Sequence, residues 1–278
     1  MAQRSWLTAA PKSRPVRCKD DKMDARMLAK MARADMELLR PIKHRGEKAQ
    51  LDLTLIRVRA VLVETRTKIV NATRGMVKGF GERLPSCDAM TMGVARASEL
   101  PEPLQRAFKH LLEEVEALSA RIKECDAELD KLAFKPYPET KLLQQASGVG
   151  TLISLAFVLT IDDPHRFAKS RDVGCFVGLR PKRSQSGASN PQLGISKEGD
   201  RYLRSLLVQG AQYILGWRGP DTDLRRWGLH LAERGGKSAK KRAIVAVARK
   251  LAVLLHRLWV TGEVYEPLRN NRPKQAAA

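Results

Sequence analysis

The chain has 278 residues, of which 43% are hydrophobic, so it is long enough to bury the cores of more than one domain. Its 51 lysines and arginines outnumber 30 aspartates and glutamates, and the formal charge of +21 favours a polyanionic partner such as nucleic acid. No apolar run is long enough to cross a bilayer and no hydrophobic signal segment opens the chain, so we expect a cytoplasmic protein that does not bind membranes. Only 5% of residues are aromatic, which favours phosphate contacts over base stacking on several rings.

The first third of the chain is predicted to be mostly helical. Residues 1–17 are basic, contain proline and lack periodicity, so we expect a loose arm. Apolar residues at helical spacing predict a helix over 21–34, and a short apolar stretch at 36–42 is compatible with a strand. A long, strongly basic helix is predicted over 47–79. Its charges fit either a solvated face or a face that contacts nucleic acid.

A heptad pattern follows an expected linker at residues 83–101. Its apolar residues alternate steps of four and three: Leu104, Phe108, Leu111, Val115, Leu118, Ile122, Cys125, Leu129 and Leu132. Such a seam predicts a coiled coil. Its partner is either a second copy, which would give a homo-oligomer, or the preceding long helix of the same chain.

The prolines at 136 and 138 mark the start of a second domain, expected to extend to 266 and to be followed by a disordered tail at 267–278. Helices are predicted near 152–161, 169–177, 200–215, 222–234 and 238–260. Gly148 and Gly150 precede the first of them, as in the hairpin of a helix-hairpin-helix element, whose amides can bind a phosphate; the alternative is a plain turn before a core helix. The last helix belongs to a second basic surface with candidate nucleic-acid contacts at Lys240, Lys241 and Arg249.

A glycine- and serine-rich stretch at 178–199 contains a candidate nucleophile, Ser186, followed by Gly187. A serine hydroxyl attacks a phosphodiester only when its proton is removed or a cationic environment stabilises the charge that develops. The surrounding cations are candidates for nucleic-acid contact: Lys182, Arg183, Lys197, Arg201 and Arg204. The plain alternative is that the Ser-Gly pair only forms a turn.

Asp21 and Asp24 lie three residues apart at the start of the first predicted helix, so both carboxylates lie on one face. Oxygen ligands of this kind suit a divalent cation, although two carboxylates are fewer than a complete site needs. The alternative is that the aspartates cap the helix.

Several motifs in order resemble those of the IS110 family of insertion-sequence transposases, from about residue 19 to 265. They are 19–29 (KDDKMDARMLA), 147–150 (SGVG), 176–181 (FVGLRP), 185–187 (QSG), 194–199 (GISKEG), 202–204 (YLR) and 243–252 (AIVAVARKLA). The resemblance implies a DNA recombinase with a ribonuclease H-like (RuvC-like) domain bearing four acids, a coiled coil and a helical transposase domain bearing a serine.

In that family the acids are taken to bind Mg²⁺, the serine to form a covalent link to DNA, and oligomers to work with a structured guide RNA. By matching motif positions, Asp21 and Asp24 correspond to the last two acids and Ser186 to the nucleophile. Ser184 takes that place if the loop aligns differently.

The resemblance fails at the front of the chain, because only 18 residues precede the first motif and none of them is acidic. We therefore expect an amino-terminally truncated transposase. The expected fold is mainly α, with a remnant of the α/β nuclease-like domain at 18–82, a linker and coiled coil at 83–135, and a helical domain at 136–266. The alternatives are a catalytically defective copy that only binds nucleic acid, and a helix-hairpin-helix repair or structural scaffold.

Overall fold

The computed structural model describes residues 21–36, 45–84, 86–191, 193–236 and 238–271. It divides into two units, 1–44 and 45–278. The described residues form helices and two isolated β-bridges but no strand, which confirms the mainly α prediction. The expected arm at 1–17 and residues 37–42 of the possible strand lie outside the described residues, so the nuclease-like remnant stays a prediction. None of the described helices is long and apolar enough to cross a membrane.

The first unit contains one described helix, α1 (Asp21–Ala34), with the predicted bounds. Asp21 and Asp24 lie in its first turn and Arg33 in its last, so the charges complement the helix dipole. None of its residues is buried, and its apolar side chains, including Met23 and Leu28, are exposed. The helix therefore has apolar residues at helical spacing, but the described residues do not bury them.

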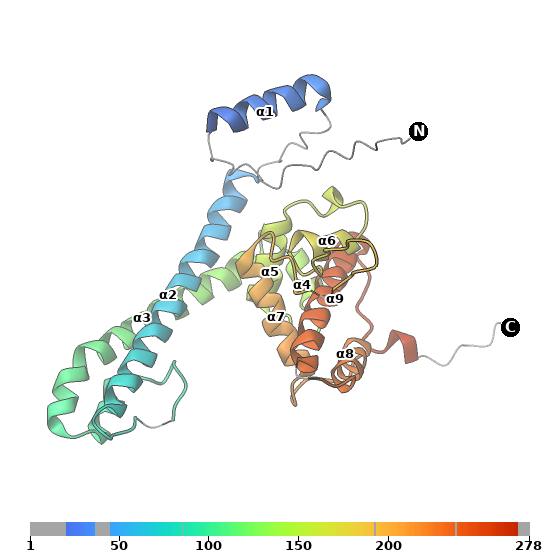
Figure 1. The fold of residues 1–278 in the computed structure, drawn as a ribbon. Helices are drawn as coiled ribbons and strands as arrows, with labels where there is room; N and C mark the ends of the chain where they lie inside the picture. Colours follow the sequence, from blue (N-terminus) through green and yellow to red (C-terminus); the bar gives the residue numbers. More distant parts are fainter. Residues whose placement is uncertain (1–20, 37–44, 85, 192, 237, 272–278) are drawn as a thin grey trace, which may run out of the picture. The chain divides into compact units, whose positions relative to one another are not determined.

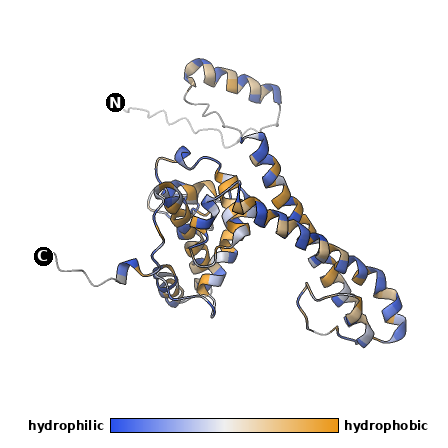
Figure 2. Ribbon diagram, turned by 180° about the vertical axis from the view of Figure 1, so that it is seen from behind, coloured by the Kyte–Doolittle hydropathy of each residue, from blue (hydrophilic) through white to orange (hydrophobic). Residues whose placement is uncertain are grey.

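The second unit begins with an antiparallel pair of long helices, α2 (Glu47–Lys78) and α3 (Glu102–Phe134), which lie side by side (Figure 1). Arg59 of α2 contacts Asp126 of α3, and Arg66, two turns later, contacts Ser119, seven residues earlier in α3. Figure 2 shows hydrophobic and hydrophilic residues alternating along both helices. The pairing is thus in register with the predicted heptads.

The heptad seam of α3 is buried against α2 of the same chain. Its central residues, Val115, Leu118 and Ile122, are all buried. The intrachain alternative is therefore the one that the structure forms. Since this seam is already covered, a homo-oligomer would have to use another surface.

The expected linker at 83–101 is folded onto the far end of the helix pair. It contains a 3-10 helix, η2 (Val94–Glu99), and its Met92, Ala97 and Leu100 are buried in a small core with residues of α2 and α3. The Val94 amide donates a 2.8 Å hydrogen bond to the Glu116 carboxylate of α3. The segment connects the two helices as expected, but it also closes their hydrophobic end.

The remaining helices form a second, larger core. They are α4 (Glu139–Leu143), α5 (Thr151–Ile161), α6 (Arg171–Phe176), α7 (Arg201–Leu215), α8 (Asp223–Glu233) and α9 (Ala239–Thr261). The apolar α5 contacts α2, α3, α4 and α7, while α9 contacts α4, α6, α7 and α8. Because residues 154–161 of α5 are all buried, this short helix lies in the interior of the domain.

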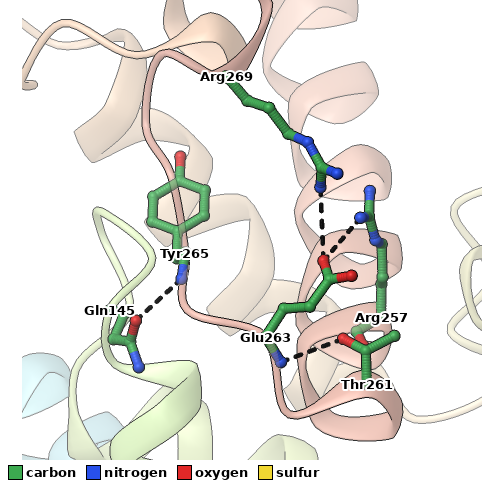
Figure 3. Close-up of polar contacts among 6 residues, drawn as sticks. All are labelled: Gln145, Arg257, Thr261, Glu263, Tyr265 and Arg269. Atoms are coloured by element: carbon green, nitrogen blue, oxygen red, sulfur yellow. Dashed lines mark hydrogen bonds and ion pairs between the residues drawn. The ribbon is translucent and has the colours of Figure 1, made fainter.

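The chain after α9 returns along the domain as a strap, residues 262–271. Glu263 accepts hydrogen bonds from Arg257 and Arg269, and the Tyr265 amide donates to the side-chain oxygen of Gln145 (Figure 3). Further along, Pro267 accepts a 2.8 Å hydrogen bond from the backbone of α8. The backbone amide of Asn270 also donates to the Asp223 carboxylate, so residues 267–271 contact the domain. The boundary at 266 stays a prediction, and residues 272–278 lie outside the described part.

A partly buried contact at the base of the helix pair makes the stability of the domain sensitive to alkaline pH. The Tyr137 hydroxyl donates a 2.7 Å hydrogen bond to the Asp52 carboxylate of α2. Burial and then this bond to Asp52 raise the pKa of Tyr137 above its usual value. A raised folded-state pKa means that the contribution of Tyr137 is complete below about pH 10, where the unfolded side chain ionises, and is lost as pH rises further.

We predict that Tyr137→Phe lowers the free energy of unfolding by about 1 kcal/mol at neutral pH, because a half-buried carboxylate loses its donor. The same variant should lose less stability than the unmutated protein between pH 8 and 11. Urea unfolding at both pH values measures the two effects. Equal alkaline losses in the two proteins would contradict the assignment, because Tyr202 and Tyr265 titrate in both.

Candidate functional site

The serine-rich stretch forms a hairpin-like loop between α6 and α7. Pro181 pairs with Ile195 across its two limbs in an antiparallel bridge. The Lys182 amide donates to the Gly194 carbonyl at 2.8 Å, and the Ser196 amide donates to the Arg180 carbonyl at 2.9 Å. The backbone is therefore held by cross-limb hydrogen bonds, and we call residues 178–199 the serine hairpin.

Ser186 lies at the start of a tight turn at the tip of the serine hairpin. Ser186 and Ser189 exchange two backbone hydrogen bonds of 3.1 and 3.0 Å, and Gly187 between them has φ of +55°. Ser186 and the fallback candidate Ser184 are both exposed. The Ser186 hydroxyl has no hydrogen-bond partner among the described residues, so the turn presents it to solvent without a side chain positioned to take its proton.

The base of the serine hairpin is closed by two glycines. Gly178 and Gly199 both have φ of +75°. A Cβ at Gly178 would collide with the Glu198 carbonyl oxygen, and one at Gly199 with the Phe176 carbonyl oxygen. Each position therefore needs glycine for two reasons, the left-handed backbone and the close approach of the facing chain.

Arg204 of α7 ties the two limbs of the base together. Its Nη1 donates to the Val177 carbonyl at 2.9 Å and to the Glu198 carbonyl at 2.8 Å. Asp200 begins the same helix by accepting a 2.7 Å hydrogen bond from the Leu203 amide. Arg204 thus has a structural role that sequence reasoning missed, and its predicted contact with nucleic acid stays a prediction.

The other predicted cations of the loop are exposed around the serine hairpin. Lys182, Arg183 and Lys197 form no ion pair with any described residue, whereas Arg180 pairs with Glu198 at 3.4 Å. Arg201 is exposed in the first turn of α7. The surface around Ser186 therefore carries unneutralised positive charge, as a phosphate-binding surface requires.

Polar contacts connect the first turn of α7, directly after the serine hairpin, to the long helix pair, and sequence reasoning missed them. Arg59 of α2 donates a 2.7 Å hydrogen bond to Asp126 of α3 and also contacts the Tyr202 hydroxyl of α7. Burial raises the pKa of Tyr202, and Arg59 acts in the opposite direction. A second ion pair, Arg57 to Asp200 at 3.7 Å, reaches the start of α7. No local pattern predicts pairs so far apart in sequence.

The two glycines before α5 face different surroundings. Gly148 has φ of +79°, and a Cβ there would lie 2.7 Å from the Gly210 carbonyl oxygen of α7. Gly150 is exposed at the start of α5, with open space where a Cβ would lie. Packing against α7 therefore explains Gly148 as a plain turn residue, and the helix-hairpin-helix assignment is not confirmed.

The second predicted basic surface lies on α9. Lys240 and Lys241 are exposed in its first turn, while the stem of Arg249 lies against Gly174 of α6, four residues before the base of the serine hairpin. The structure thus brings Arg249 toward the serine hairpin. The two lysines lie about 13 Å further along the helix axis, at 1.5 Å per residue.

Asp21 and Asp24 are exposed on α1, which belongs to the other unit. Within the described parts of the chain, no group of three or more His, Cys, Asp or Glu residues is arranged to hold a metal ion. Two carboxylates one turn apart do not by themselves complete the oxygen shell of a divalent cation. The described residues therefore do not fit a finished magnesium site.

Comparison with known proteins agrees with the motifs that surround the serine hairpin. The model of the transposase IS116/IS110/IS902 family matches residues 140–225, and a DEDD-type IS110 transposase model matches residues 7–81. The chain is 31% identical to the transposase for insertion sequence element IS1111A of Coxiella burnetii, over 89% of this chain and 68% of that protein. The chain belongs to the IS110 transposase family.

Two further relatives extend this comparison. A putative transposase of Sinorhizobium fredii, y4pF/y4sB, is 33% identical over 90% of this chain and 64% of its own length. A pilin gene-inverting protein of Moraxella lacunata is 28% identical over 48% of this chain and 37% of its own length. The chain spans about two thirds of the length of the Coxiella and Sinorhizobium relatives.

The base of the serine hairpin gives a matched pair of glycine substitutions. Gly178→Ala adds both backbone strain and a collision with Glu198, whereas Gly187→Ala, at the tip, adds strain in open space. We predict a loss of about 1 kcal/mol for Gly187→Ala and about 3 kcal/mol or more for Gly178→Ala. Urea unfolding compares the two, and similar losses would show that the base is not closely packed in solution.

Proposed function

We propose that this IS110-family chain takes part in DNA transposition and that Ser186 is its nucleophile. The observation that carries the proposal is the serine hairpin, which presents an exposed hydroxyl at a tight turn amid cations that no described acid neutralises. Family membership supplies the substrate class, since the named relatives are transposases of insertion sequences. Ser184 remains the alternative nucleophile.

The proposed step is a transesterification. The Ser186 oxygen attacks the phosphorus and loses its proton, one bond from phosphorus to a strand oxygen breaks, and that oxygen leaves as a hydroxyl after taking up a proton. Attack by a strand hydroxyl on the phosphoserine reverses the exchange and joins DNA. Because each step exchanges one phosphate ester for another, no external energy source is required.

The residues of the serine hairpin contribute binding and charge to this step. Lys182, Arg183 and Lys197 are exposed on the serine hairpin. In this proposal they contact phosphates near the one attacked, where their charge favours the pentacoordinate transition state. Arg204 holds the base from which the tip projects. In this proposal, the group that accepts the Ser186 proton enters the site only when DNA binds.

Mg²⁺ remains part of the proposal only as a prediction from family resemblance. If bound, a divalent cation would stabilise charge on the phosphate. Asp21 and Asp24 would be two of its ligands, and the described residues contain no group of three or more such side chains that could hold the ion. A guide RNA and a homo-oligomer likewise stay predictions, and the covered seam of α3 is not available for the latter.

The nucleophile is tested by trapping. A DNA substrate nicked so that the cleaved strand diffuses away should leave a covalent protein–DNA adduct, detected by denaturing electrophoresis with Mg²⁺ and the element's RNA present. We predict that Ser186→Ala abolishes the adduct because no oxygen remains to attack. Ser189→Ala, at the other end of the same turn, should retain it.

Each alternative gives a different outcome in this assay. An adduct that survives Ser186→Ala but is lost in Ser184→Ala would move the nucleophile two residues along the loop. If the unmutated chain forms no adduct but binds DNA, the chain acts as a nucleic-acid-binding protein without strand chemistry.

The phosphate contacts are tested separately from chemistry. We predict that replacing Lys182, Arg183 and Lys197 together by Gln reduces the slope of log affinity for duplex DNA against log salt by about 2.7, since each phosphate contact contributes about 0.9. Fluorescence anisotropy across a salt series measures this slope.

A matched control removes the same charge elsewhere. Lys68, Arg106 and Lys109 lie on the long helices and are each paired with a glutamate one turn away. Replacing these three by Gln should change the slope by less than 1. Equal changes in the two triple variants would mean that net charge, not the serine hairpin, determines DNA binding.

A further inference from the structure

The loop between α7 and α8 displays a tryptophan that the proposed chemistry does not use. Trp217 is 84% exposed, the most exposed of the large hydrophobic side chains in the described part of the chain. The Arg218 guanidinium lies 4.4 Å from the centroid of its ring. Exposing a side chain of this size to water is unfavourable, so a function in binding is the natural explanation.

The position of Trp217 does not result from a loose loop. Arg225 of α8 donates hydrogen bonds to the carbonyls of Ile214 and Gly216, on the amino-terminal side of the tryptophan. On the other side, the Gly219 amide donates to the Gly216 carbonyl at 3.1 Å, and a Cβ at Gly219 would collide with Ile214 and Arg225. The backbone around the ring is therefore fixed, and the ring is held outward.

We propose that Trp217 is a stacking platform for an unpaired nucleobase of single-stranded nucleic acid. An aromatic face accepts any base, and the Arg218 guanidinium adds charge next to the ring for the adjoining phosphate. Tyr213, one helical turn earlier and about half exposed, lies beside Gly148 and provides a second ring. The sequence composition disfavoured stacking on several rings, but one or two rings at one position are sufficient.

The surroundings of Trp217 favour a nucleobase over an apolar protein surface. Its neighbours in the loop are glycines, Arg218, a proline and Asp221, and none of them adds a large apolar side chain beside the ring. A protein interface of useful affinity would need a larger apolar core. The excess of basic residues in the chain also attracts a polyanion.

The platform lies at the opposite end of α7 from the serine hairpin. The 15 residues of α7 span about 22 Å, which is roughly six base pairs of duplex DNA at a rise of 3.4 Å. The inference rests on the proposed function only in assuming that the chain binds nucleic acid. It adds that an unpaired segment lies several nucleotides from the reacting phosphate.

The experiment compares single-stranded and duplex probes on the full chain. Anisotropy of a labelled 20-nucleotide single strand should show Trp217→Ala weakening its binding by about 5-fold to 100-fold. Binding of the duplex of the same sequence should change less than about twofold, because duplex bases are already stacked. Trp217→Phe should retain most of the single-strand affinity, and the salt slope should not change, because no phosphate contact is removed.

Controls separate stacking from general effects. Phe80, an exposed aromatic residue just after α2, has no cation over its ring among the described residues. Phe80→Ala should bind both probes as the unmutated chain does. Parallel DNA and RNA single strands identify which nucleic acid supplies the base. Circular dichroism should show unchanged folding in every variant, since the Trp217 side chain lies outside the core.

Three results would overturn the proposal. Trp217→Ala could leave the affinity for the single strand unchanged, or it could lower the affinities for single strand and duplex equally. It could also change the oligomeric state in sedimentation while nucleic-acid binding stays intact. The last would assign Trp217 to a contact between protein chains. The covalent adduct of Ser186 is an independent readout. A chain without adduct formation but with a selective effect of Trp217→Ala would retain the stacking platform and lose only the proposed chemistry.

Discussion

The close contact between two backbone segments at the base of the serine hairpin is the constraint on which the candidate site depends. Gly178 faces Glu198, Gly199 faces Phe176, and Arg204 donates to a carbonyl of each limb. One limb is continuous with α6 and the other with α7, so the contact fixes where the two helices meet. A serine at the tip of a loop of this length has a defined position only because its base is fixed.

The helix pair α2 and α3 is coupled to this base through polar contacts. Arg57 reaches Asp200 at the start of α7, and Arg59 joins Asp126 to Tyr202. Arg59, Asp126 and Tyr202 are partly buried, so the charges of that pair are less screened than those of a surface pair, whereas Arg57 is exposed. These contacts join α2 and α3 to the first turn of α7, which directly follows the serine hairpin and carries Arg204.

Periodicity predicted where the helices lie but not which surfaces they meet. The spacing of apolar residues predicted α1, α2, α7 and α9 within a few residues of their observed bounds, because a helix that packs on one face has apolar residues at helical spacing. The heptad pattern of α3 is the same whether its partner is α2 or another chain, so the sequence left both alternatives open. In the structure Val115 and Ile122 are buried within the single chain.

In the candidate site, too, the sequence indicated the residues that could carry chemistry but not the contacts that hold them in place. Ser186 and its flanking cations could be picked out because they carry the chemistry, whereas Arg204 could not be told from Arg201, although one binds the loop base and the other faces solvent. The partners of Arg204 are backbone carbonyls, and every residue has one, so no sequence pattern identifies them. Gly148 was ambiguous for a similar reason, because a phosphate and the backbone of α7 both require a residue without a side chain.

The exposed serine and the exposed tryptophan together suggest how binding precedes reaction. Within the described residues Ser186 has no base beside it, and the proposed chemistry therefore needs groups that arrive with the bound strand. A strand held at Trp217 and along the cations of the serine hairpin would bring its own phosphate, and whatever groups accompany it, to the tip. Reactivity then depends on correct assembly rather than on a preformed charge at the serine.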